Sequence, residues 1–129
     1  MLDKHIAAIS CLAYAPGSKR LASGCANKEI VVWDVAAGTP LSWGLQGFHP
    51  TRITCLTFSA AGVLASGGVD GSIIVWGDLP AGPFKPPPKH KLHGSTTHAG
   101  GVSALAFVGD GAVLASAGLD ACIKTWTVA

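Results

Sequence analysis

Charged residues are scarce in this 129-residue sequence, since Asp, Glu, Lys and Arg together make up 12% and the formal net charge is +2. Binding to phosphate backbones usually requires a strongly basic surface, so nucleic acid is disfavoured as a partner. Mean hydropathy is +0.44, yet no apolar run approaches the ~18 residues of a membrane-spanning helix. No basic region leads into an apolar leader either. We therefore expect a chain that avoids membranes and works in the cytoplasm, with the nucleus and the cilium left open.

The usual motifs of catalysis and cofactor binding are also missing. There is no phosphate-cradling glycine loop, no nucleophile elbow, and no close pair among the seven carboxylates. His90, His93 and His98 lie close in sequence, but no Cys, Asp or Glu stands between them, which favours a polar loop over a metal site. The cysteines are widely spaced in apolar segments, and we expect reduced thiols at Cys11, Cys25, Cys55 and Cys122. These observations predict no enzymatic activity, no cofactor and no metal.

What the sequence does contain is a repeat. Three segments align: "HIAAISCLAYAPGSKRLASGCANKEIVVWDV" from His5, "HPTRITCLTFSAAGVLASGGVDGSIIVWGDL" from His49 and "HAGGVSALAFVGDGAVLASAGLDACIKTWTV" from His98. Their starts are 44 and then 49 residues apart. Periods of this length are typical of propellers and solenoids, in which each repeat is one supersecondary unit.

Each repeat reads as short β-strands joined by tight turns. "ISCLAY", "ITCLTF" and "VSALAF" open the copies, "LASG" or "LASA" follows, and "EIVVW", "SIIVW" and "CIKTW" close them. A fourth strand is predicted near Leu41–Leu45 in the first copy and near Lys89–Leu92 in the second, whereas the third copy stops first. Polar and apolar residues do not separate cleanly onto two faces, which favours sheets covered on both sides. About eleven strands are expected.

These residues resemble the WD-repeat β-propeller family, whose signature is Gly-His near the start of a repeat and Trp-Asp at its end. Trp33-Asp34 is the literal dipeptide, while Trp76 and Trp126 keep only the Trp, and none of the three His residues follows a Gly. The resemblance covers about nine tenths of the chain and implies an all-β fold of antiparallel four-stranded blades, the last incomplete. The implied blades span about 5–47, 49–93 and 98–129 within one segment 1–129, with a proline-rich insert at 80–97.

The resemblance also implies a structural relay of hydrogen bonds from His to Ser to an Asx residue and to Trp. Its members are His5, Ser23, Asn27 and Trp33 in the first copy, His49, Ser66, Asp70 and Trp76 in the second, and His98, Ser116, Asp120 and Trp126 in the third. A buried indole N–H and a buried imidazole each need a partner, which is the physical reason for such a relay. The uncharged Asn27 predicts a weaker relay in the first copy.

Three blades cannot close a ring, because propellers typically have ~4–8. We expect the chain to be the C-terminal part of a longer propeller, or else to pair with a second copy as a six-bladed dimer. The expected function is a non-enzymatic scaffold that presents propeller-face loops to proteins, within a multi-subunit complex. The residues that the resemblance places on that face are Ala8, Arg52 and Gly101 before the first strands, with Ala26, Val69 and Leu119 beside the turns. Arg52 is the only charged member and the expected main contact.

Two other functions remain open at this point. The chain could be the propeller part of a larger enzyme or complex subunit, with the chemistry elsewhere. Alternatively, the basic loop 85–91 could bind nucleic acid or acidic lipid weakly through Lys85, Lys89 and Lys91. The Pro83-x-x-Pro86 spacing beside it fits a polyproline II ligand, although a stiff linker explains it as well.

Overall fold

The computed structural model describes residues 7–15, 17, 20–42, 51–76, 88–92, 98–109 and 112–127, with the backbone alone for 39–42 and 88–92. His5, His49, Lys85 and the Pro83-x-x-Pro86 pair, with most of the insert, lie outside these residues. The described residues form eleven strands and no helix. A helix with the length and apolar character of a membrane span is therefore absent from this part of the chain.

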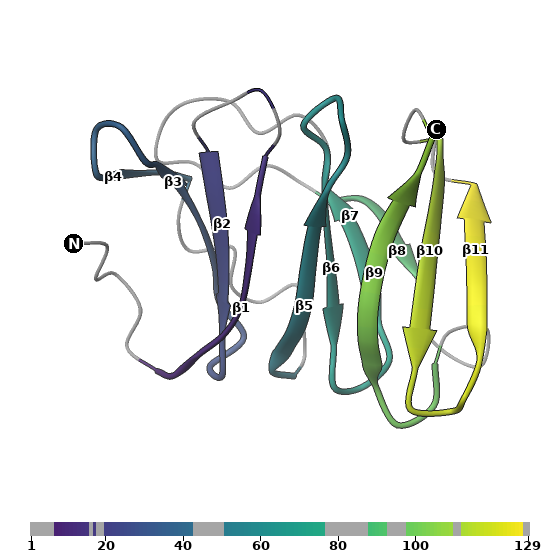
Figure 1. The fold of residues 1–129 in the computed structure, drawn as a ribbon. Helices are drawn as coiled ribbons and strands as arrows, with labels where there is room; N and C mark the ends of the chain where they lie inside the picture. Colours follow the sequence, from purple (N-terminus) through teal and green to yellow (C-terminus); the bar gives the residue numbers. More distant parts are fainter. Residues whose placement is uncertain are drawn as a thin grey trace.

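The strands form three antiparallel sheets, each made from one repeat (Figure 1). The first sheet contains β1 (Ile9–Tyr14), β2 (Arg20–Cys25), β3 (Ile30–Asp34) and β4 (Thr39–Ser42) in that order. The second contains β5 (Ile53–Phe58), β6 (Leu64–Gly68), β7 (Ile73–Trp76) and β8 (Pro88–Leu92). The third contains β9 (Val102–Val108), β10 (Val113–Gly118) and β11 (Ile123–Thr127).

Each sheet is a chain of hairpins, because every strand pairs with its neighbour in sequence. Turn residues close the hairpins: Gly62 adopts a φ of +87° between β5 and β6, and Gly71 a φ of +88° between β6 and β7. Glycine reaches this left-handed region at little cost, since it has no Cβ. The fourth strand of the first sheet, β4, begins two residues before the predicted Leu41, because the turn after Trp33 closes at Gly38.

The sheets stand side by side in chain order, with β5 in contact with both β1 and β9 (Figure 1). One apolar cluster joins the first sheet to the second through Val32, Ile53 and Trp76, among others. A second cluster joins the second sheet to the third through Val75 and Val102. Alternate residues of a strand face opposite sides, so the middle sheet sends apolar side chains into both clusters.

The predicted coverage of both faces therefore holds for the second sheet, where β5 is mostly buried. It does not hold for the first strand of the first sheet, where the side chains of Leu12 and Tyr14 are 61% and 58% exposed. No described sheet packs on that side. The all-β prediction of propeller-type blades, with the last one incomplete, is confirmed.

Candidate functional site

The most complete polar network lies in the third sheet and contains four side chains. Trp126 Nε1–H donates to Ser116 Oγ at 2.9 Å, and Ser116 Oγ lies 2.7 Å from His98 Nε2. His98 Nδ1 lies 2.8 Å from Asp120 Oδ1. One tautomer satisfies every group: His98 carries its proton on Nδ1 and donates it to the carboxylate, and Nε2 accepts from the serine hydroxyl.

Burial sets the character of this network. His98 and Ser116 are each 1% exposed, whereas the side chain of Asp120 is 18% exposed. The hydrogen bond from His98 lowers the pKa of the Asp120 carboxyl, since it stabilises the charged form. Gly118 lies directly against the imidazole, because a Cβ on it would be 2.4 Å from His98 Cγ. The strand before the turn must therefore carry glycine for the ring to fit.

The second sheet holds its serine and tryptophan in the same way. Trp76 Nε1–H donates to Ser66 Oγ at 3.0 Å, and both residues are fully buried. Asp70 is exposed, and its predicted partner His49 lies outside the described residues, so the relay beyond Ser66 stays a prediction. Asp70 Oδ1 accepts from Thr51 Oγ1 at 3.2 Å and from Ser72 Oγ at 2.6 Å. The carboxylate thus fastens the turn to the segment before β5, a role that the sequence analysis did not assign.

In the first sheet the described residues include one of the predicted bonds, since His5 lies outside them. Trp33 Nε1–H donates to Ser23 Oγ at 2.9 Å. Asn27 Oδ1 accepts from Cys25 Sγ at 2.9 Å. All three serine hydroxyls therefore accept an indole N–H, and all three residues are buried.

The turns between the second and third strands lie at one end of the three sheets, hereafter the turn face (Figure 1). Each repeat closes this end with the same backbone hydrogen bond, from the residue after the second strand to a carbonyl before the first. These bonds are 3.0–3.1 Å long: Ala26 N to Ala8 O, Val69 N to Arg52 O, and Leu119 N to Gly101 O. The six residues expected on a common face are thus brought together in three pairs.

Exposure divides these six residues. Ala8, Ala26 and Arg52 are exposed, and Val69 and Leu119 are 38% and 74% exposed. Gly101 is buried, contrary to expectation, because its Cα lies against the neighbouring turn. A Cβ there would be 2.8 Å from Val69 O, so this position joins two sheets and offers no side chain to a partner.

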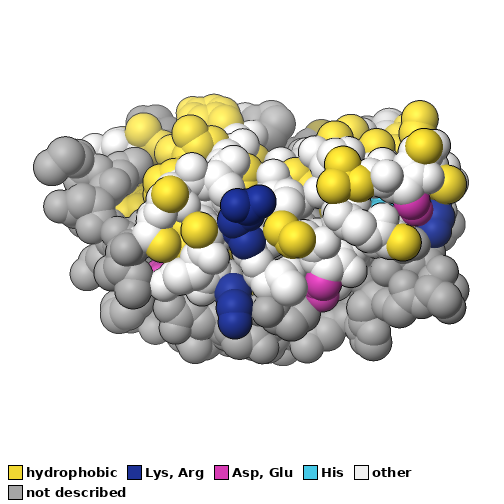
Figure 2. Space-filling model, turned by 90° about the horizontal axis from the view of Figure 1, so that it is seen from below, with side chains coloured by type: hydrophobic (Ala, Val, Ile, Leu, Met, Phe, Trp, Pro, Cys, Tyr) yellow, Lys and Arg dark blue, Asp and Glu magenta, His cyan; other side chains and the backbone are white. Residues whose placement is uncertain are grey.

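A second cation on the turn face was missed. Lys28, in the turn between β2 and β3, is exposed and adopts a φ of +75°. The alignment of the repeats carried a signal for this turn conformation. The residue that matches Lys28 in the second repeat is Gly71, and glycine tolerates a positive φ. Figure 2 shows Lys and Arg side chains near the middle of the turn face and another beside an acidic side chain at its edge.

The family comparison agrees with this geometry. The model of "WD domain, G-beta repeat" matches residues 1–34, 45–77 and 88–127, which together are most of the chain. The chain belongs to the WD-repeat family. Members of this family are generally not enzymes.

Several WD-repeat proteins are similar over almost the whole chain. A "66 kDa stress protein" of Physarum polycephalum is 34% identical over 99% of this chain. "Actin-interacting protein 1-2" of Arabidopsis thaliana is 35% identical over 98% of it, and "WD repeat-containing protein 1-B" of Xenopus laevis is 35% identical over 94%. The chain spans only about a fifth of the length of these relatives, namely 20%, 20% and 19%.

Neighbouring WD repeats are also joined by hydroxyl groups at the second residue of the first strand. Ser10 Oγ–H reaches Ile53 O at 2.5 Å and Gly24 O at 3.2 Å. Thr54 Oγ1–H does the same one repeat later, with Val102 O at 2.5 Å and Gly67 O at 3.2 Å. Each hydroxyl thus connects a carbonyl of its own sheet with the first residue of the next sheet.

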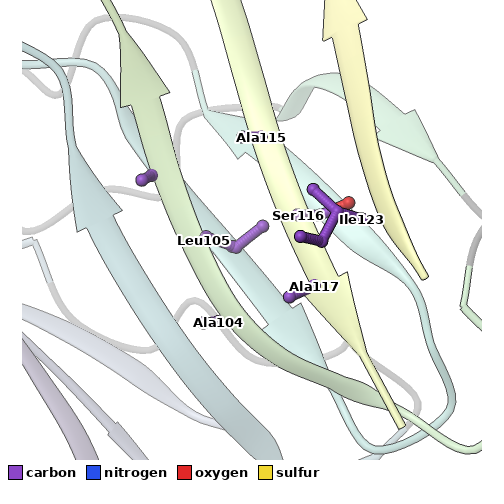
Figure 3. A pocket seen from close by; sticks show the side chains of 7 residues that line it. Ala104, Leu105, Ala115, Ser116, Ala117 and Ile123 are labelled. Carbon is purple, nitrogen blue, oxygen red and sulfur yellow. The ribbon is translucent and has the colours of Figure 1, made fainter. Parts of the chain in front are cut away.

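The third WD repeat presents the same side to no described sheet. Ser103 Oγ–H donates to Ala117 O at 3.1 Å, which is the bond within the sheet alone. Beside it lies a shallow pocket of about 160 Å³ (Figure 3). Its lining is almost entirely apolar and comprises Ala104, Leu105, Ala106, Ala115, Ser116, Ala117 and Ile123. Ile123 is 80% exposed, so this side is an unpaired inter-repeat surface.

The cysteines of the WD repeats are all free. Burial raises the pKa of the Cys55 thiol to about 11 and also raises the pKa of Cys11. Cys122 is exposed in the turn after Asp120. Among the described residues, no three His, Cys, Asp or Glu side chains lie close enough together to hold a metal ion.

Proposed function

We propose that this chain is a non-enzymatic WD-repeat scaffold whose turn face docks protein partners. The observation that carries the proposal is the contrast between two sets of residues. The relay side chains are engaged in hydrogen bonds within their sheets, as the buried Ser66 and Ser116 show. Arg52 and Val69 at the end of the second sheet, and Leu119 at the end of the third, are exposed to solvent. Arginine and exposed apolar groups of this kind are typical anchors of protein interfaces.

The name of the Arabidopsis relative, an actin-interacting protein, makes actin the first partner to test. We propose that the chain meets such a partner as part of a larger assembly. The chain matches one fifth of that protein, so this partner is a proposal for the chain. The apolar side of the third sheet supports a second element of the proposal, that further WD repeats complete the ring. Ser103 holds the position from which Ser10 and Thr54 reach the next sheet.

The free cysteines support an intracellular site of action, because secreted domains commonly pair such residues. Export of the tagged chain into the growth medium would contradict this placement. The alternative of a basic docking loop depends on Lys85, which lies outside the described residues, and on the side chains of Lys89 and Lys91, of which the structure gives only the backbone. Mutations in the loop and on the turn face distinguish this alternative from docking at the turn face.

The decisive experiment measures binding of purified actin to the immobilised chain. Arg52→Glu should weaken binding by about 1–3 kcal/mol, because it removes a five-donor group and places a like or unpaired charge at the contact. Arg20→Glu makes the same charge change at the opposite end of the first sheet and should leave binding unchanged. The triple variant Lys85→Gln/Lys89→Gln/Lys91→Gln removes the charges of the basic loop, keeps the residues of β8 in the chain and should also do little. Normal binding by Arg52→Glu together with loss in the triple variant would transfer the function to the loop.

A further inference from the structure

Two exposed cations lie at the junction of the first and second sheets. Lys28 is in the β2–β3 turn, and Arg52 directly precedes β5. Gly24, near the end of β2, lies so close to Ile53 that a Cβ on it would be 2.7 Å from Ile53 Cγ2. The segments after Gly24 and before Ile53 therefore run side by side at the turn face, and Figure 2 shows Lys and Arg side chains near its middle.

Neither cation is used by the fold. Among the described residues, the Lys28 ammonium and the Arg52 guanidinium have no hydrogen-bond or ion-pair partner. Glu29, which follows Lys28 in the same turn, is 7% exposed and takes part in an interaction of its own. Asp70, in the turn of the second sheet, is engaged with Thr51 and Ser72. The cation at the edge, Lys124, lies close enough to Asp120 to lower the pKa of that carboxyl. Among the described side chains of the turn face, the cations without a partner therefore lie at one junction.

The repeat itself does not require these charges. The position of Lys28 is Gly71 in the second repeat and Ala121 in the third. All three residues adopt a positive φ, including Ala121 at +62°, so this conformation belongs to the turn and the turn accepts residues without charge. The position of Arg52 is Gly101 in the third repeat, where the contact with Val69 O excludes any side chain. The second junction therefore has neither cation, and an exposed carboxylate, Asp70, stands beside Gly71 there.

We propose that this junction binds an acidic segment of a protein partner, with carboxylates against Lys28 and Arg52 and an apolar side chain against Val69. The inference rests on the proposed docking function of the turn face and names the chemistry of its ligand. Charge complementarity carries it, because two unpaired cations beside the exposed Ala26 and Val69 match an acidic peptide with apolar residues. Nucleic acid lacks the apolar group and needs a larger basic surface.

The test uses a fluorescent peptide of alternating glutamate and leucine and measures its affinity by anisotropy. We expect Lys28→Gly and Arg52→Gln each to lower the affinity about three- to tenfold at low salt, and the double variant to lower it further. Raising the salt from 50 to 300 mM should weaken wild-type binding several-fold and leave the double variant nearly unaffected. Arg20→Gln and Lys124→Gln are the matched controls and should bind as wild type.

Lys28→Gly separates charge from folding, since it places in the turn the residue that the second repeat uses there. Its melting temperature should equal or exceed that of the wild type, so a loss of affinity cannot come from unfolding. Equal affinity of wild type and double variant for the peptide would overturn the inference. Tighter binding of a 20-base-pair DNA duplex, through the same two residues, would overturn it in favour of nucleic acid. Actin binding that responds to Arg52→Glu without any peptide binding would retain the scaffold and refute the acidic ligand.

Discussion

The hydroxyl of Ser10 offers a sharp test of how adjacent WD repeats are held together. Ser10→Ala removes a donor that serves two carbonyls, Ile53 O and Gly24 O, and both of those residues are buried. A net hydrogen bond contributes about 1 kcal/mol, and acceptors left buried without a donor raise the cost, so we expect a loss of about 1–2 kcal/mol. Ser103→Ala is the chemically identical control, because its hydroxyl makes only the exposed bond to Ala117 O.

Urea unfolding followed by tryptophan fluorescence measures this difference, since Trp33 and Trp76 are buried. With a typical slope of 1–3 kcal/mol per molar urea, Ser10→Ala should lower the midpoint by roughly 0.3–2 M. Ser103→Ala should stay within about 0.5 kcal/mol of the wild type. Equal midpoints for the two variants would refute the idea that the bond between sheets, and not the one within the sheet, carries the stabilisation.

Two further predictions concern single side chains. The lowered pKa of Asp120 means that its stabilising contribution is present above the unfolded value of about 3.8 and fades as pH falls through the folded value. The melting temperature of Asp120→Asn should therefore lie below that of the wild type at pH 6, and the gap should narrow as pH falls below about 3.8. A gap that is independent of pH would contradict the role of the charge. Cys122, which is exposed, should react with iodoacetamide at pH 7.5 well before Cys55, whose pKa is about 11. Mass spectrometry of tryptic peptides identifies the labelled residue, and first labelling at Cys55 would show that its site opens.

The sequence alone was sufficient for the elements and their order. Alternation of side chains has a period of two, and residues such as Gly62 and Gly71 mark where a hairpin must turn, so both signals are local. The resemblance to the WD repeat implied the pairs Ser66–Trp76 and Ser116–Trp126, which the structure shows hydrogen-bonded. Strands β2 and β3 form one hairpin and strands β6 and β7 another, and the turn sets the register of each pair.

Only the tertiary structure decided which residues meet across sheets. Ser10 and Ile53 are 43 residues apart, and nothing in either segment indicates that a hydroxyl of one will reach a carbonyl of the other. The same holds for Lys28 and Arg52, which come to one junction because Gly24 lets the second sheet approach closely. Gly101 reads as an exposed loop residue and is buried because the neighbouring turn packs on it. Such contacts depend on how far one packed sheet stands from the next, a distance set by the side chains of both sheets together.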